Sequence, residues 1–322
     1  DAELESLVMT WVKKEKDADI QLFDRRDIYS AAFSYIAKWC NDHHRADLAY
    51  CFYMHSNKSH DILNCVPWGY CSPKMLFMAY AHDEDYKYLI SLHESENRSD
   101  WSTWIVDYDQ FPSNAYLWDK RFELNRVKEF YFTFLVREDR LEEALAVAQS
   151  VDEHYWKQET DVIEFNPFIL DVYRMERKPL RLTKPQFLEH LVALKSKPYE
   201  DPEKESGRLF ALANAYYAMT FNGNAWMMMH DYKSWDASNY VCGTTSNLED
   251  IWWGCSRAKP YFENALKLSS NKDIAYASGL RLVECENSFR TLRNKQAIAY
   301  NRSQAFDLLI AKDFDMADWL KC

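Results

Sequence analysis

Eight side chains in the first quarter of the chain carry atoms that commonly bind zinc. They are Cys40, His43, His44, Cys51, His55, His60, Cys65 and Cys71. A zinc site needs about four converging ligands, commonly in short C-x2-4-C or H-x3-5-H pairs. His55 and His60 form the only pair with such spacing, and no cysteines form a CxxC pair. We therefore expect surface histidines and buried thiols, with no metal site and no cofactor.

Two acidic side chains beside tryptophans could do a second kind of chemistry. Asp231 and Asp236 are close in sequence to Trp226 and Trp235, and a glycoside hydrolase uses two carboxylates about 5 to 10 Å apart. Aspartates in a polar loop are more often solvated or cap a helix. The chain also lacks the G-x-S-x-G, H-E-x-x-H, P-loop and dinucleotide-binding patterns. An enzyme on an α/α scaffold is therefore the alternative interpretation, and we expect no catalytic residue.

These residues belong to an aromatic insert at residues 221–257. Its rings can fill the space where two separated helices must still pack, or they can form a recognition surface together with nearby polar groups. We favour packing, with Trp226 buried by the helix and with Trp252 nearer the surface. The residues that could bind a ligand or partner are Trp226, Asp231, Trp235, Asp236, Tyr240 and Trp252.

The segments that flank the insert fit the two halves of a tetratricopeptide-type helical hairpin. The first has the W-x2-L-G-x2-Y spacing at Leu209, Leu212, Ala213 and Tyr216. The second continues the pattern at Ala258, Phe262 and Ala265. This spacing predicts a helical solenoid, whose usual work is binding, and here one hairpin is split by the insert.

Capping residues give the expected ends of the helices around the insert. Thr183 to Gln186 have the capping-box arrangement, and Asp201 can cap a helix that ends near Thr220. Asn222-Gly223-Asn224 is a helix stop, because glycine and asparagine tolerate the left-handed conformation. Pro260 conflicts with a helix interior, so the second helix either starts near Ser256 or is kinked.

Other periodic segments predict further helices. One hairpin combines a helix that ends near Trp39, a turn at Asn41 and Asp42 and a helix through Tyr53, and another combines Leu124–Leu135 with Leu141–Ala148. Between these hairpins we expect a helix at residues 74–93, a polar joint at 94–99 and an irregular aromatic stretch at 101–118. Residues 168–178 should form a short helix, and the last helix should end near residue 319.

Composition supports an all-α protein. The 322 residues are 48% hydrophobic, enough for a substantial core, and include only six glycines, too few for many tight β-turns. We expect N-terminal helical hairpins at 1–98 and a tetratricopeptide-like helical region at 99–322.

A net charge of −11 without a basic stripe argues against nucleic acid as a partner, and no apolar run is long enough to span a membrane. The first residues do not resemble a signal peptide, and a missing initiator methionine suggests a processed or truncated chain.

Several short sequence motifs, or phrases, distinguish this chain from a generic solenoid. These are Asn166-Pro167-Phe168, the run from Leu212 to Trp226, the run from Pro260 to Leu266, and Cys285-Glu286-Asn287. Together they resemble the C-terminal part of a group of large, uncharacterised tetratricopeptide-like proteins of Bacteroides-type bacteria. The run from Leu212 to Trp226 departs from the group's pattern at Ala218, where asparagine is usual, and at Asn222, where an aromatic residue is usual.

The resemblance implies that an N-terminal region precedes this chain and that the protein is exported or associated with the cell envelope. It supplies no activity and no catalytic residue. Taken together, the sequence predicts an α-solenoid of tetratricopeptide-like hairpins (an α/α superhelix) that acts as a non-catalytic binding or scaffold protein. Its expected partner is a protein or peptide segment, or a glycan.

Overall fold

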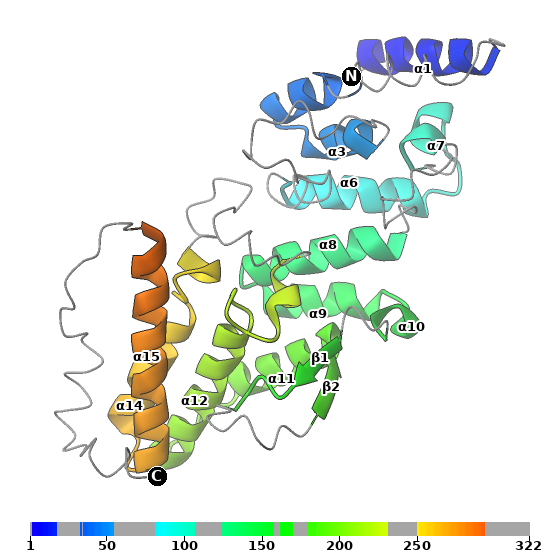
Figure 1. Cartoon of the computed structure of the whole chain (residues 1–322). Helices are drawn as coiled ribbons and strands as arrows, with labels where there is room; N and C mark the ends of the chain where they lie inside the picture. Colours follow the sequence, from blue (N-terminus) through cyan, green and yellow to red (C-terminus); the bar gives the residue numbers. More distant parts are fainter. Residues whose placement is uncertain are drawn as a thin grey trace. The chain divides into compact units, whose positions relative to one another are not determined.

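The computed structural model of the chain describes residues 2–17, 33, 35–54, 81–106, 124–157, 162–169, 179–230 and 250–293. In this part the chain is mostly helical and has one small antiparallel sheet (Figure 1). It divides into two compact units, the first containing described residues up to Tyr131 and the second those from Phe132 onward. The division therefore falls inside a helix, whereas the sequence suggested residue 98.

The described residues of the first unit form several helical segments. They are α1 (Ala2–Asp17), residues 35–42, α3 (Ala46–Met54), α6 (Asp83–Glu94), α7 (Asp100–Val106) and the first part of α8 (Leu124–Arg137). Helix α6 packs against α3 and α7, and α7 also contacts α1. An aromatic group forms part of the core, where the Trp101 and Trp104 rings stack 5.4 Å apart and Phe52 lies 5.4 Å from Trp104.

Three sequence predictions for this unit can be compared with the structure. The turn before α3 is present, but it lies at His43 and His44, where His44 has a φ of 59°. The single helix predicted for residues 74–93 is interrupted at Ala81 and His82, which are not helical; α6 begins at Asp83, and residues 74–80 lie outside the described residues. The aromatic stretch predicted as irregular contains helix α7, in which Trp101 and Ile105 are four residues apart and are both buried.

The second unit contains the end of α8 and the elements that surround the insert. These elements are α9 (Leu141–Gln149), α10 (Glu153–Trp156), β1 (Val162–Phe165), β2 (Pro179–Thr183), α11 (Lys184–Ser196), α12 (Pro202–Ala218), the 3-10 turn η2 (Trp226–Met228), α14 (Ala258–Leu268) and α15 (Lys272–Arg293). Helix α11 packs on α9 and α12, while α12 packs on α14 and α14 on α15. The last three helices lie side by side in Figure 1.

The caps predicted for α11 and α12 are confirmed. The Thr183 backbone N–H donates to Gln186 Oε1 at 3.0 Å, and the Gln186 N–H reaches Thr183 Oγ1 at 3.5 Å. Asp201 Oδ1 accepts from the backbone N–H groups of Glu203 and Lys204 at 2.9 and 3.0 Å. Local side chains thus satisfy donors that the first turn of each helix leaves without partners.

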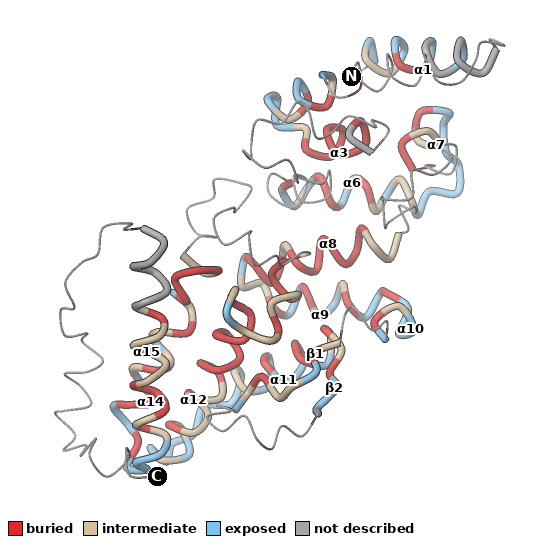
Figure 2. The backbone as a smooth tube through the Cα atoms, viewed as in Figure 1, coloured by how far each residue is buried: buried red, intermediate tan, exposed pale blue. Residues whose placement is uncertain are grey.

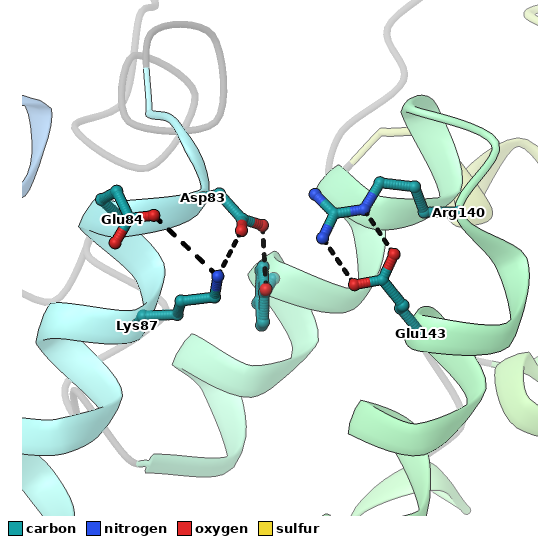
Figure 3. A network of polar contacts seen from close by, with 6 residues as sticks. Asp83, Glu84, Lys87, Arg140 and Glu143 are labelled. Atoms are coloured by element: carbon teal, nitrogen blue, oxygen red, sulfur yellow. Dashed lines mark hydrogen bonds and ion pairs between the residues drawn. The ribbon is translucent and has the colours of Figure 1, made fainter.

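Ion pairs lie at the starts of two other helices, one in each unit (Figure 3). At the start of α6, Lys87 Nζ contacts Asp83 Oδ2 at 2.5 Å and Glu84 Oε1 at 4.0 Å. At the start of α9, Arg140 makes a two-point pair with Glu143 at 2.6 and 2.7 Å. Exposed pairs of this kind contribute about 0 to 1 kcal/mol each, so we assign them a small role in stability.

The two-stranded sheet corrects the all-α prediction. Strands β1 and β2 pair antiparallel, with Ile163 opposite Leu182 and Phe165 opposite Pro179. Ile163 and Leu182 are both buried, so the sheet covers part of the core with one face. The strands are short, and Val162, Ile163 and Phe165 are residue types that favour strands. The short helix predicted for residues 168–178 falls mostly outside the described residues.

Helices α12 and α14 bury every position of the predicted hairpin pattern. Leu212, Ala213, Phe262 and Ala265 are fully buried, and the remaining pattern residues are at most 8% exposed. Figure 2 marks much of both helices as buried. The exposed Pro260 is the third residue of α14 and lies in its first turn, where proline removes no helical hydrogen bond. The predicted conflict is therefore absent.

Candidate functional site

A cavity of about 160 Å³ opens in the second unit where α12 ends and the insert begins. Its lining combines the turn after β1, the last turns of α12, the first turn of the insert and one residue of α15. The described lining residues are Phe165, Asn166, Pro167, Ile169, Asn214, Tyr217, Ala218, Asn222, Gly223, Asn224 and Arg281. Four of them are asparagines, so the wall carries many amide donors and acceptors.

A tight turn after α12 shapes one side of the cavity. The Gly223 N–H donates to the Thr220 carbonyl at 3.0 Å, and the Ala225 N–H donates to the Ala218 carbonyl at 2.9 Å. A Cβ on Gly223 would lie 2.0 Å from the Ala218 carbonyl oxygen, a backbone atom that cannot move aside. The helix stop predicted here is therefore present, but glycine is needed for close approach and not for a left-handed φ.

Two asparagine side chains are held in place by backbone carbonyls. Asn224 Nδ2 donates to the Phe165 carbonyl at 2.9 Å and so joins the insert to the end of β1. Asn214 Nδ2 donates to the Phe210 carbonyl at 3.0 Å, one turn earlier on α12. Each amide that donates in this way keeps its oxygen as an acceptor. These contacts fix the orientation of both amides at the wall of the cavity.

Arg281 supplies the only charge among the described lining residues. Its guanidinium lies over the Tyr217 ring at 4.3 Å from the ring centroid, and its Nη1 donates to Glu284 Oε2 at 2.5 Å. The Arg281 Nε atom is buried and has no hydrogen-bond acceptor. Because Glu284 offsets the positive charge of Arg281, the cavity wall carries little net charge.

Tyr217 completes this group as a protonated phenol. Its hydroxyl donates to Glu284 Oε2 at 3.3 Å. Burial raises the pKa of Tyr217 above its usual value, although the neighbouring Arg281 lowers it. The phenol therefore stays protonated at physiological pH and serves as a donor and as an aromatic surface for Arg281.

The two ends of the insert are tied to the end of α8. Arg257 Nη1 donates to the Val136 carbonyl at 2.8 Å, and its other terminal nitrogen donates to the Arg137 carbonyl. Arg137 Nε in turn donates to the Met229 carbonyl at 2.7 Å. The two bonds from Arg257 satisfy carbonyls at the end of α8, and together the three bonds tie Met229 and Arg257 of the insert to this helix end.

Trp252 and Trp253 pack against each other with their ring centroids 6.1 Å apart, and the described tryptophans of the insert are not among the cavity lining residues. Trp252 is only 3% exposed, and its carbonyl accepts from the Phe221 N–H at 3.1 Å. The Trp253 ring lies 4.3 Å from Phe221, and His230 lies 5.1 Å from Trp252. Trp226 is half-buried, so the prediction that Trp252 is the more exposed of the two is wrong.

The six predicted binding residues therefore have different outcomes. Trp226 and Trp252 are absent from the described lining of the cavity, and Asp231, Trp235, Asp236 and Tyr240 lie outside the described residues. By contrast, Asn166, Tyr217 and Asn222 to Asn224 line the cavity and belong to phrases that carried the family resemblance. Their convergence was not predicted, and no sequence pattern pointed to Arg281.

The cysteine and histidine group of the first unit is described only in part. Cys40 and Cys51 are buried and form no disulfide, and burial, reinforced by Asp47, raises the pKa of Cys40 to about 12. His43 is exposed and stacks on Trp39 at 4.1 Å. Within the described ranges, no three His, Cys, Asp or Glu side chains are grouped to hold a metal ion. The four candidates from His55 to Cys71 fall outside those ranges.

Two further observations concern the chain as a whole. Among the helices that the structure describes, none is both long and apolar enough to cross a membrane. Comparisons of the sequence and the structure with protein-family models, curated proteins and solved structures found no match.

Proposed function

We propose that the protein is a non-catalytic binding or scaffold protein with tetratricopeptide-like helical hairpins. Its cavity takes one neutral, polar unit of a larger partner, which is a peptide, a protein segment or a glycan. The observation that carries this proposal is the combination of orientated asparagine amides and Arg281 in the lining of one cavity. The proposed link to an exported or envelope-associated family rests on the sequence resemblance alone.

The tetratricopeptide-like part of the proposal is supported by burial and by the order of packing. Helices α12 and α14 bury all the pattern positions, and α11, α12, α14 and α15 each pack on the next helix in this series. Contact mainly between neighbours along the chain is typical of helical repeats, whose surfaces usually bind other molecules.

The chemistry of the wall indicates what the bound unit carries. Arg281 is a guanidinium donor in the lining, while the amide oxygens of Asn214 and Asn224 can accept hydrogen bonds. A hydroxyl or an amide group suits both the donor and the acceptors without bringing a charge. The volume, close to the roughly 150 Å³ of a cavity known to hold benzene, fits a single small unit.

The described lining includes no aspartate or glutamate. A glycoside hydrolase with paired carboxylates, the alternative from the sequence, therefore gains no support from this cavity. We assign the cavity to binding.

The proposal is tested by measuring binding to panels of neutral glycans and uncharged peptides by calorimetry or NMR. Arg281→Lys keeps the positive charge but removes the planar guanidinium and its N–H donors, and Asn214→Asp removes the amide donor that binds the Phe210 carbonyl and so orients this side chain. Each change should weaken binding about tenfold or more, because a lost buried hydrogen bond costs about 1 to 3 kcal/mol. Asn264→Asp, the same change at an exposed position of α14, is the matched control and should leave Kd within about twofold.

Two results would count against the proposal. One is that no member of either panel binds the folded protein. The other is that Arg281→Lys and Asn214→Asp bind a ligand as tightly as Asn264→Asp, which would place the binding surface elsewhere.

A further inference from the structure

The four asparagines of the cavity lining differ in the residue that follows each of them. The following residue matters because its backbone nitrogen can attack the asparagine side chain, which is one reason why asparagine is thermolabile. Among the six glycines of the chain, only Gly223 follows an asparagine. The four pairs in the lining are Asn166-Pro167, Asn214-Ala215, Asn222-Gly223 and Asn224-Ala225.

Asn222 is the most accessible of the four asparagines. It is exposed, whereas Asn214 is buried and Asn166 and Asn224 are half-buried. Gly223 has no Cβ to shield its nitrogen from the neighbouring side chain. The Asn222-Gly223 pair therefore combines a side chain that water reaches with the least hindered backbone nitrogen that a following residue can offer.

The other three asparagines are protected by their surroundings. Asn166 is followed by proline, whose nitrogen has no proton to release. Asn214 lies inside α12, where the next N–H is bound within the helix. Asn224 is followed by Ala225, whose N–H donates to the Ala218 carbonyl at 2.9 Å. The lining thus supplies three internal controls for Asn222.

One hydrogen bond restrains the Gly223 nitrogen. Its N–H donates to the Thr220 carbonyl at 3.0 Å, so the turn must open before the nitrogen can reach the Asn222 side chain. Losing one such bond lowers the population of the reactive form about 2- to 13-fold. Local opening of this size does not require the chain to unfold. Glycine is nevertheless needed at this position, because a Cβ would lie 2.0 Å from the Ala218 carbonyl oxygen.

We infer that Asn222 is a site of spontaneous deamidation, which adds a negative charge to the cavity wall. The Gly223 nitrogen bonds to Asn222 Cγ while the Cγ–Nδ2 bond breaks, and the Gly223 proton leaves with the side-chain nitrogen as ammonia. Water then opens the cyclic imide. Attack at Cγ gives aspartate, and attack at the Asn222 backbone carbonyl carbon gives isoaspartate. The net reaction converts an amide and a water into a carboxylate and an ammonium ion, without oxidation or reduction.

Both products change the chemistry of the wall. They place a carboxylate in a lining whose described residues include no aspartate or glutamate. Arg281, the charged residue of that lining, is already offset by Glu284. Isoaspartate also lengthens the backbone of a turn that has no room for a Cβ at Gly223. We expect deamidation to weaken binding of a neutral unit; this consequence rests on the proposed function, whereas the deamidation itself does not.

The test ages the folded protein in mildly alkaline buffer, digests it at acidic pH to suppress further reaction and follows the four asparagines by mass spectrometry. Asn222 should convert into a mixture of aspartate and isoaspartate, while Asn166, Asn214 and Asn224 of the same molecules keep their amides. In urea-unfolded protein, Asn222 should react about 2- to 13-fold faster than in the folded protein. Conversion of Asn222 no faster than that of the other three, or protection by folding beyond about a hundredfold, would overturn the inference.

Two variants separate the reaction from its consequence. Asn222→Gln keeps an amide but needs a larger ring, so conversion at this position should disappear; unchanged conversion would contradict the attack by Gly223. Asn222→Asp carries the charge of the product, and it should bind a neutral glycan or uncharged peptide that binds the parent protein about tenfold more weakly. Equal affinity would refute the effect on the wall. A parent protein that binds neither panel would instead count against the proposed function, while mass spectrometry still decides on deamidation.

Discussion

Replacing Gly223 by alanine tests whether the turn after α12 is as tight as the structure indicates. The new Cβ would lie 2.0 Å from the Ala218 carbonyl oxygen, so the turn would have to open. Opening it would break the bonds from Gly223 to Thr220 and from Ala225 to Ala218. Each bond contributes about 0.5 to 1.5 kcal/mol, and a buried Ala225 N–H without a partner costs about 1 to 3 kcal/mol. We expect Gly223→Ala to lower the free energy of unfolding by about 2 to 4 kcal/mol.

The matched control is the same substitution inside α12. A Cβ at Gly207 would meet nothing within 4 Å, and alanine favours a helix over glycine by about 1 kcal/mol. Gly207→Ala should therefore raise the free energy of unfolding by up to about 1 kcal/mol. Replacing glycine by alanine is therefore expected to lower the free energy of unfolding at position 223 and to raise it at position 207.

Urea unfolding followed by circular dichroism measures both variants against the unchanged protein. The midpoint should fall for Gly223→Ala and rise for Gly207→Ala, with the slopes compared to confirm that the same structure unfolds. A Gly223→Ala protein as stable as the parent would refute the close approach, and with it the described shape of the cavity wall.

Four further predictions follow from packing, capping and charge. Phe262→Ala should lower the free energy of unfolding by about 3 to 5 kcal/mol in the same urea assay, because Phe262 is fully buried. The control on the same helix is Leu268→Ala, which removes a side chain that is 43% exposed and should cost less than about 1 kcal/mol. Asp201→Ala should cost about 1 kcal/mol by removing the cap of α12, and unchanged thermal unfolding would contradict that role. Burial and the Asp47 carboxylate raise the pKa of Asp85. The stability that this group contributes is therefore present below pH 3.8 and is lost as the pH rises through its folded pKa. Asp85→Asn should remove this fall in the free energy of unfolding with rising pH. Burial lowers the pKa of His93 from 6.5 to about 4, so stability should fall as the pH drops through that interval, and His93→Gln should remove the loss if the assignment is correct.

Local signals in the sequence predicted much of the second unit. The caps at Thr183 and Asp201, the stop near Gly223 and the buried pattern of α12 and α14 all depend on residues a few positions apart. Such features are set by backbone geometry and by one helix face, and the sequence displays both directly. The tetratricopeptide-like arrangement of the whole chain remains a proposal.

Features that depend on distant partners were not predicted. The sheet joins residues 162–165 to residues 179–183, and each strand is too short to give a clear alternating pattern. Arg281 reaches the cavity only because α15 packs beside α12, and Arg257 caps a helix that ended more than a hundred residues earlier. The rings of the insert drew attention to binding by their type, but packing decides which of them are exposed, and Trp252 is buried.

The most direct test of the proposed binding role is an NMR titration of the protein with neutral glycans and uncharged peptides. We predict that a bound ligand shifts amide signals around Asn214, Tyr217, Asn222 to Asn224 and Arg281 together. The same ligand should give much smaller shifts in the Arg281→Lys variant. Saturable binding that leaves these signals unchanged and shifts another part of the chain would contradict the claim that this cavity is the binding site.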